Sequence, residues 1–363
     1  MGPGGVKREV FPEIAAPQAL GGYFLALAFA VNNLRVNSFC VRGTRGRTSA
    51  HGRTMQDHFS GRPSCIQGSH FPGASAQGDL LDHHGRRLAA LDRLRAVAAE
   101  CGLGTDPDRD LLVLPEDAVS LLEGVGGAWA DLGDAIRAFR ATLPLLPLDL
   151  FGFPAESEDS LAEGSAQLRH IGGGVEAWAF EDREGSIYKF FRPIEAQWIG
   201  ATFRYEPDED HALRAEACPG SYRDLLEKLD VINAIGGMPT EVVGVTPEGV
   251  LVVKQVLGER LPEGTDTSEL LPPALIAWPS RFLRCDRDHP RLAFVRGRAW
   301  LVADPHDRNV VRAADGSARI IDVVAAPVEG EAVDRHPLLL DWLQRVKLDP
   351  AAPLLAVADD ADL

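Results

Sequence analysis

Residues 300–324 constrain this chain most, because they contain a tight reversal between two short apolar segments. The pair Asp315-Gly316 separates two predicted strands, 309–312 and 319–322. An Asp-Gly pair between apolar runs is a strong signal for a two-residue hairpin loop, because both central positions of its type I′ turn need positive φ. We therefore predict a β-hairpin that is closed by these two residues.

The register of such a hairpin would bring polar side chains together at its open end. With a two-residue turn, Val310 faces Ile321 and Asn309 faces Asp322, and directly opposed Cβ atoms lie roughly 4.5–5.5 Å apart. Asp304 follows the preceding apolar run and lies five residues before Asn309. We expect the carboxamide of Asn309 and the carboxylate of Asp322 to lie close enough to share one metal ion, and Asp304 to converge on the same spot. An ordinary polar hairpin end is the alternative.

Three consecutive glycines upstream separate the predicted strands 167–171 and 175–180. Because Gly172, Gly173 and Gly174 have no side chains, the backbone can approach a ligand closely and turn its amides towards phosphates. A tight turn that binds nothing is the alternative interpretation of the same residues. The segment is therefore a candidate anion-binding loop.

Lys189 is a charge inside the aromatic and apolar strand 186–191. Strand alternation places it on the same face as Ile187 and Phe191. A lysine on a half-buried face needs an anionic partner, because burial of an unpaired ammonium is costly. The alternative is a lysine on an edge strand that is exposed to water. We interpret Lys189 as a phosphate-binding residue.

The order of these features resembles that of the protein-kinase-like superfamily. A glycine segment, a strand lysine, a helix (221–235), two strands (241–245 and 250–255), an Asp-x4-Asn loop and a second aspartate follow one another. The chain is most similar to the polyvalent protein kinase group of phages and mobile elements, in LLEKLDVIN…VVGVT and in RIIDVV. The usual His-Arg before the first aspartate and Phe-Gly after the second are absent.

The resemblance implies an α+β, two-lobed protein-kinase-like fold. The first lobe is expected at residues 155–257, as an antiparallel β-sheet with one main helix, and the second at residues 258–350, reduced and mainly helical. Apolar residues at helical spacing predict an N-terminal helical extension, residues 76–154, that packs on the first lobe. Residues 1–75 are predicted to be a disordered tail, and residues 351–363 an acidic tail.

The resemblance also implies a role for each candidate residue. Asp304 would be the catalytic base, and Lys189 would hold the ATP phosphates while a carboxylate of helix 221–235 pairs with it. Glu227 is the predicted partner, with Asp224 in reserve. The further positions are those expected to bind ATP (Gly172, Gly173, Gly174, Gln255 and Leu257) and Mg²⁺ (Asn309 and Asp322).

Charge and cysteine content limit the partners of the chain. The net charge is −16, of which residues 1–75 carry +5 and the remainder −21. An acidic body argues against wide nucleic-acid contact, which needs a basic face, but not against a nucleotide. Five scattered cysteines are typical of a reduced, cytoplasmic protein. The apolar segment 23–31 is too short to span a bilayer, and a signal peptide is the less favoured alternative, so no membrane partner is expected.

These observations favour an ATP- and magnesium-dependent kinase that transfers the γ-phosphoryl group to a protein hydroxyl. Two alternatives are open. The Asp-x-His-x-x-Asn form of the loop is also typical of phosphotransferases for sugars, antibiotics or other small molecules, and only 41 residues follow Asp322, which is too few for the peptide-docking helices of a eukaryotic kinase. A catalytically inactive pseudokinase would keep the fold as a binding module without turnover.

Overall fold

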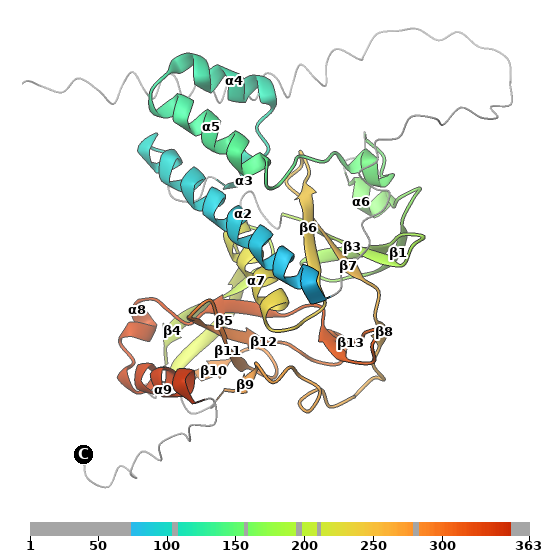
Figure 1. Cartoon of the computed structure of the whole chain (residues 1–363), viewed down its shortest axis with the longest axis vertical. Helices are drawn as coiled ribbons and strands as arrows, with labels where there is room; N and C mark the ends of the chain where they lie inside the picture. The colour runs from blue at the N-terminus through green and yellow to red at the C-terminus, as the bar shows by residue number, and fades with distance from the viewer. Residues whose placement is uncertain are drawn as a thin grey trace, which may run out of the picture. The chain divides into compact units, whose positions relative to one another are not determined.

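The computed structural model of the protein describes residues 74–103, 108–155, 159–193, 198–208, 212–278 and 283–349. All of them belong to a unit that begins at Ser69. The predicted tails, 1–75 and 351–363, lie outside the described residues except for the first turn of a helix. Helices are mixed with mainly antiparallel sheets, which confirms the α+β class (Figure 1). No described helix is long and apolar enough to cross a membrane.

Four α-helices lie in the described part of the segment that was predicted as a helical extension. Its helices are α2 (Ala74–Glu100), α3 (Asp108–Leu112), α4 (Glu116–Val125) and α5 (Ala128–Arg140). The apolar positions that recur at helical spacing in α2 are buried, as Leu91, Leu94 and Ala98 show. Helix α2 packs on α5 and on the later helix α7 (Tyr222–Ala234).

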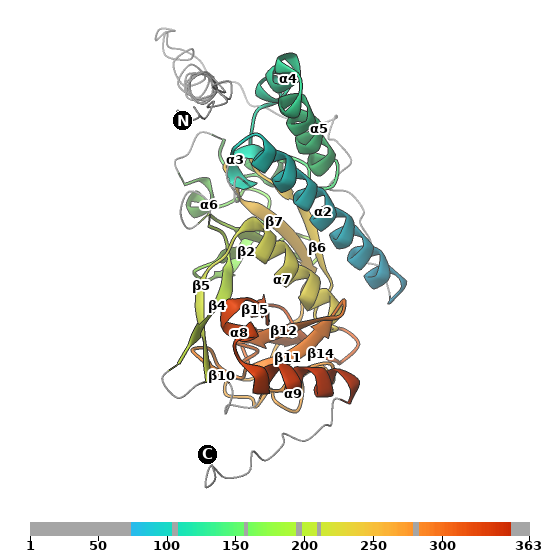
Figure 2. The same ribbon diagram turned by 90° about the vertical axis from the view of Figure 1, so that its left-hand side faces the viewer.

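Polar groups of α2 bind the extension to the rest of the unit. The Arg87 guanidinium donates to Thr142 O from Nε at 3.1 Å and from Nη2 at 3.0 Å. The ring of His84 is buried, and its Nε2 lies 3.0 Å from Asn233 Nδ2 on α7. Figure 2 shows α2 and α7 side by side against strands β6 (Thr240–Val245) and β7 (Leu251–Val256). The extension therefore packs on the first sheet, as predicted.

The first sheet is antiparallel and has five strands in the order β1-β2-β3-β7-β6. Its other strands are β1 (Arg169–Gly173), β2 (Ala177–Glu181) and β3 (Ser186–Phe191). One face packs on the short helix η1 (Leu148–Phe151) through T-shaped aromatic pairs, with Phe151 and Phe190 centroids 5.3 Å apart. The small helix α6 (Ser160–Glu163) precedes this sheet. The predicted strands of the first lobe are thus present.

Helix α7 begins where the sequence predicts. The Ser221 hydroxyl accepts from the Asp224 amide, and the Asp224 carboxylate accepts from the Ser221 amide at 2.7 Å, which forms a capping box. The hairpin that precedes the helix was not predicted. It consists of β4 (Ala201–Pro207) and β5 (Leu213–Pro219), and β5 also pairs in parallel with β10 (Leu283–Cys285).

The second half contradicts the expectation of a mainly helical second lobe. Strands dominate the described part of residues 258–350, because its apolar runs are short and are separated by tight turns. One such turn has positive φ at both Arg296 (51°) and Gly297 (79°), as a two-residue hairpin loop requires. The further strands are β8 (Glu259–Arg260), β9 (Ile276–Ala277), β11 (Arg291–Val295), β12 (Arg298–Ala303), β13 (Val310–Arg312), β14 (Ala318–Ile320) and β15 (Val324–Pro327).

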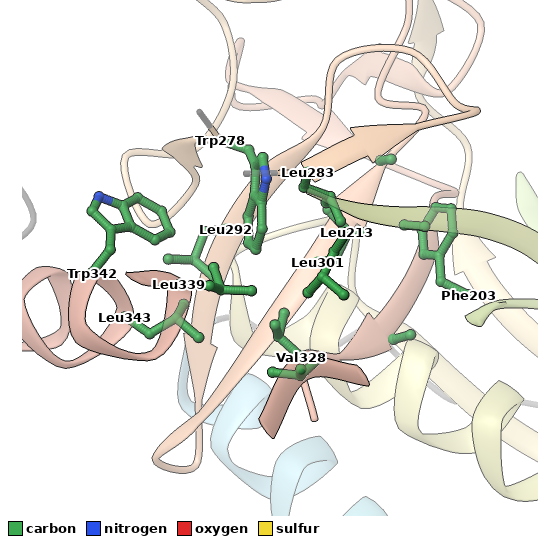
Figure 3. Close-up of a cluster of buried hydrophobic side chains, with 14 of the residues drawn as sticks. Phe203, Leu213, Trp278, Leu283, Leu292, Leu301, Val328, Leu339, Trp342 and Leu343 are labelled. Atoms are coloured by element: carbon green, nitrogen blue, oxygen red, sulfur yellow. The ribbon is translucent and has the colours of Figure 1, made fainter. Parts of the chain in front are cut away.

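The core of the second half lies between these strands and helix α9 (Pro337–Leu348), which follows the short helix α8 (Glu331–Asp334). Figure 3 shows Leu339 and Leu343 of α9 directed at Leu292 and Val328. The rings of Trp278 and Trp342 form a T-shaped pair with centroids 5.5 Å apart. Phe203 of β4 and Leu213 of β5 belong to the same cluster, so the unpredicted hairpin packs with the second half of the chain.

Candidate functional site

The hairpin that ends near Asp322 is present, but its register differs from the predicted one by one residue. Val310 pairs with Ile320 instead of Ile321, and Val311 pairs with Arg319. Consequently the backbone amide of Ile321 donates to Asn309 O at 2.8 Å, and Asp322 lies one residue beyond the position opposite Asn309. The prediction that Asn309 and Asp322 are directly opposed is therefore wrong.

The turn chemistry explains this shift. The Ala313 amide donates to Ser317 O at 2.8 Å, so these two residues close the loop and it has three residues, 314–316. Gly316 has φ of 81°, and Asp315 Oδ1 accepts from the Ser317 amide at 2.9 Å. A type I turn followed by a left-handed glycine is the usual three-residue hairpin loop. The Asp-Gly pair was identified correctly as a turn, but its loop is one residue longer than predicted.

Asp304 begins the loop that leads into this hairpin. It follows β12, has φ of 72°, and its amide donates to Asp288 O at 2.7 Å. Asn309 Nδ2 donates back to Asp304 O at 2.9 Å, which closes the loop 304–309 on itself. His306 Nε2 lies 3.4 Å from Asp304 Oδ1. A non-glycine residue with positive φ is uncommon and marks a locally constrained backbone.

The carboxyl group of Asp304 has a raised pKa. Burial is the main cause, and the neighbouring carboxylates of Asp288 and Asp322 add to it, while the charges of His306 and Arg287 act in the opposite direction. The charge of Asp322 therefore acts on the carboxyl group of the predicted base.

Asp322 lies between two lysines. Its Oδ1 is 3.3 Å from Lys228 Nζ and accepts from the amide of Val323 at 2.9 Å. Burial raises the pKa of the Asp322 carboxyl, but the charges of Lys228 and Lys189 outweigh burial and hold that pKa below its ordinary value. Asp322 is therefore a carboxylate at neutral pH and carries the charge that a cation ligand needs.

Lys189 extends from β3 to the segment that contains Asp322. Its Nζ donates to the carbonyl oxygen of Ile321 at 2.6 Å. Burial lowers the pKa of Lys189, and Asp322 opposes this shift. The side chain of Gln255, in β7, donates to the same carbonyl oxygen at 3.2 Å and to Thr240 Oγ1 at 2.7 Å. The structure thus brings the predicted strand lysine to the predicted metal-binding aspartate.

The predicted pair between Lys189 and Glu227 is not formed. Glu227 Oε1 accepts from Arg223 Nη2 at 3.0 Å and from Arg298 Nη1 at 3.1 Å, and the reserve residue Asp224 caps the helix. The residue of α7 that reaches the site is Lys228, whose Nζ lies 2.7 Å from Glu176 Oε2. Consecutive helix positions differ by 100° in direction, so the faces of residues 227 and 228 are far apart.

The glycine segment is partly a strand. Gly172 and Gly173 belong to β1 and pair with Ala179 and Trp178 across a β-bulge, so their amides are not all available to a ligand. The turn itself covers residues 174–177, closed by Gly174 N–H and Ala177 O at 2.9 Å. Glu176, the partner of Lys228, lies in this turn. The turn of the glycine segment, Lys228 and Lys189 therefore lie close together.

Gln255 and Leu257, which were expected to bind ATP, differ in which of their groups are already hydrogen-bonded within the protein. Gln255 is buried and its side chain is used as described above. The amide of Leu257 donates to Gly185 O at 3.1 Å, so its carbonyl oxygen is the backbone group that could accept a hydrogen bond from a ligand. Leu257 has an exposed side chain. The residue after it, Gly258, is packed so closely on Val311 that an added Cβ would lie 2.4 Å from Val311 Cγ2.

The donor set suits a hard cation that keeps some of its own water. Asn309 and Asp322 offer a carboxamide and a carboxylate oxygen, and Asp304 offers a second carboxylate. Mg²⁺ is usually held by one or two carboxylates together with water and phosphate oxygens. Among the described residues, no group of three His, Cys, Asp or Glu side chains that could hold a metal ion is found.

A hollow of about 670 Å³ lies elsewhere, lined by Leu81, Asp82, Gly85, Arg86 and Arg296. None of the candidate site residues lines it, and Arg296 is used there to bind Leu81 O and Asp230 Oδ1.

No family model, curated protein or solved structure matches this chain. The function of this chain is therefore inferred from the geometry of its candidate site.

Proposed function

We propose that this protein is a magnesium- and ATP-dependent phosphotransferase with a two-lobed, protein-kinase-like arrangement, and that a protein hydroxyl is its acceptor. One observation carries the proposal. Lys189, in the first sheet, lies against the segment 321–322 of the second half, with Nζ 2.6 Å from Ile321 O and with its pKa affected by Asp322. A lysine of the first sheet thus lies beside the segment that contains the aspartate expected to bind magnesium.

Each residue has a distinct task in this proposal. Lys189 holds the α- and β-phosphates through its ammonium group, as a point charge with three donors. Asn309 and Asp322 hold magnesium, and the turn after Gly173 covers the phosphates. The carbonyl oxygen of Leu257 accepts from the amino group of adenine. When bound, magnesium supplies positive charge that neutralises the phosphates and favours the transfer of the γ-phosphoryl group.

Asp304 orients the acceptor hydroxyl and receives its proton. The raised pKa of Asp304, which burial causes first, makes the carboxylate a stronger base than an exposed aspartate. His306, 3.4 Å from Asp304 Oδ1, restrains the orientation of that carboxylate. Catalysis in this scheme is mainly positioning of the acceptor and stabilisation of charge.

A small-molecule acceptor is the second candidate. The described residues that follow Asp322 form β15 and the helices α8 and α9, and these pack in the core beside Trp278. The Asp-x-His-x-x-Asn form of the loop from Asp304 to Asn309 favours such an acceptor. A sugar or an antibiotic hydroxyl would require the same Asp304.

A pseudokinase is the third candidate. Consecutive glycines, 172–174, stand where the family has spaced ones, and Val323-Val324 follow Asp322 in place of Phe-Gly. Both departures from the family pattern favour a role in binding over turnover. In this case the protein would bind a nucleotide but would not transfer its phosphoryl group.

Isothermal titration of the full chain with ATP, with and without MgCl₂, tests the proposal. We expect binding that strengthens with Mg²⁺, and incubation with ATP should then add 80 Da steps to a protein substrate or to the chain itself. A panel of sugar and aminoglycoside alcohols, assayed for ADP release, separates the second candidate. Binding without any transfer would support the pseudokinase, and no binding with or without Mg²⁺ would contradict all three.

A further inference from the structure

The buried cluster around Lys228 contains charged side chains that have no task in the proposed mechanism. Lys228 is 0% exposed, and its Nζ contacts Glu176 Oε2 at 2.7 Å and Asp322 Oδ1 at 3.3 Å. These three residues come from α7, from the turn of the glycine segment and from the segment after β14. The chain therefore buries a second lysine beside the aspartate expected to bind magnesium.

We propose that Lys228 is a positioning residue, which together with Glu176 fixes the carboxylate of Asp322 in the orientation that binds Mg²⁺. This inference rests on the proposed function, because it assigns a task at the same site. Helix α7 was expected to supply a carboxylate to the site. In the structure it supplies the cation Lys228, and the carboxylate, Glu176, comes from the turn of the glycine segment.

The geometry of Asp322 supports this task. Its Oδ1 is held by two groups, Lys228 Nζ and the Val323 amide at 2.9 Å. The other oxygen, Oδ2, is then the one available to a cation, and the Asp322 side chain keeps 29% exposure while the Lys228 side chain has none. Full burial keeps Lys228 away from a nucleotide, so it acts through Asp322 and not on the phosphates.

The surroundings of Lys228 restrict its motion. Its Nζ lies 5.6 Å from the centroid of the Phe191 ring, and Glu176 is itself restrained because its carbonyl oxygen accepts from the Arg192 amide at 3.2 Å. Groups that hold a metal ligand by hydrogen bonds commonly affect metal affinity by about 10- to 100-fold. A fixed Lys228 can therefore orient Asp322 before any cation binds.

A purely structural role explains the cluster less well. Buried ion pairs can often be replaced by apolar residues without loss of stability, because the desolvation of both charges offsets their attraction. The two lysines, Lys189 and Lys228, also balance the charges of Glu176 and Asp322.

The test compares Lys228→Met with Lys254→Met in the full chain. Lys254 is also buried, but it lies in strand β7 of the first sheet. Its Nζ is near the Tyr188 ring, 5.6 Å from the ring centroid. ATP affinity is measured by isothermal titration over a series of MgCl₂ concentrations. We expect Lys228→Met to raise, by about 10- to 100-fold, the Mg²⁺ concentration that gives half of the gain in ATP affinity. ATP affinity without Mg²⁺ should change little. Lys254→Met should leave both quantities unchanged.

A double-mutant comparison separates positioning from folding. Glu176→Gln should give a smaller shift in the Mg²⁺ requirement, and Glu176→Gln/Lys228→Met should resemble Lys228→Met alone, because Glu176 acts through Lys228. If Lys228→Met does not fold, as thermal unfolding would reveal, the double variant removes both charges of the pair and carries the test. An unchanged Mg²⁺ requirement in a folded variant, while the parent binds Mg-ATP, overturns this inference only. Absence of Mg-dependent binding in the parent overturns the proposed function instead.

Discussion

Two buried polar clusters on helix α7 differ in kind. Around Asn233, the side chain and the backbone of Thr240 exchange neutral hydrogen bonds at 2.8 and 2.9 Å, and His84 Nε2 joins them at 3.0 Å. Around Lys228, in contrast, ammonium and carboxylate groups meet. Residues 228 and 233 are five positions apart, or about 140° around the helix, so the clusters lie on different faces.

The difference between these clusters indicates different tasks. A neutral network connects α2, α7 and β6 and stabilises the fold, because Asn233 is hydrogen-bonded to both backbone groups of Thr240 and to His84 Nε2. A charged network is costly to bury, and this one includes the aspartate that is proposed to bind Mg²⁺. We therefore expect changes in the neutral cluster to alter stability, and changes in the charged cluster to alter nucleotide binding.

Loss of Lys189 should give the largest effect, and only on binding. Lys189→Met removes the ammonium expected at the phosphates, so we expect ATP to bind about 10- to 100-fold more weakly in the presence of Mg²⁺, as for the loss of a charge-assisted hydrogen bond. Titration calorimetry measures the affinity. Lys254→Met serves as the matched control, and equal affinities in the two variants would break the comparison.

Loss of Asn233 should have the opposite profile. Asn233→Ala leaves the buried N–H and C=O of Thr240 without their side-chain partner, so we expect the free energy of unfolding to fall by about 2–3 kcal/mol. Denaturation in urea measures this change. Asn309→Ala is the sharpest comparison, since it should weaken Mg-dependent ATP binding with a smaller change in stability. A variant of Asn233 that is as stable as the parent would refute the structural role.

The pH dependence of stability should reveal His84. Burial and the charge of Arg87 lower the pKa of His84 to about 3, against the bond to Thr240 O, and Arg296 and His83 lower it further. The unfolded chain takes up this proton near pH 6.5 and the folded one does not. The free energy of unfolding should therefore fall by roughly 2 kcal/mol as the pH decreases from 6.5 to 5.

His84→Gln supplies the control for this titration. The variant has no imidazole to protonate, so its unfolding free energy should fall less steeply over the same pH range. Urea denaturation at several pH values measures both slopes. If parent and variant lose stability in parallel, His84 is not the titrating group.

The smallest effect is expected in the hairpin loop. Gly316 has φ of 81° with open space around it, so Gly316→Ala meets backbone strain but no steric clash. We expect a loss of about 1 kcal/mol in the free energy of unfolding. Gly258→Ala offers a contrast, because its Cβ would contact Val311 Cγ2 at 2.4 Å and should cost more. Thermal unfolding of both variants gives the comparison, and equal stabilities would contradict it.

Local patterns were sufficient for much of the first half of the fold. The helical spacing in α2 and the capping residue Ser221 located two main helices, and the alternation in β3 placed Lys189 beside apolar neighbours. The β-rich second half was missed, because its short strands depend on partners that are distant in sequence, as in the pairing of β5 with β10. Such pairing is fixed by tertiary packing more than by propensity.

The candidate site was predicted in composition more accurately than in detail. Asp304, Asn309, Asp322 and Lys189 follow from spacing, but the hairpin register was wrong by one residue because the Asp-Gly turn belongs to a three-residue loop. Lys228 was missed because a lysine in an amphipathic helix usually lies at the surface. Only the fold shows that this position is buried against two carboxylates.

The most direct test of the central claim is the Mg²⁺ dependence of ATP binding in the parent and in Asp322→Asn. Calorimetry at fixed ATP and increasing MgCl₂ should show that Mg²⁺ strengthens binding to the parent, and that the variant, although folded, loses this gain. If Asp322→Asn binds Mg-ATP as tightly as the parent, the site around Asp322 does not hold the metal and the proposed function is wrong.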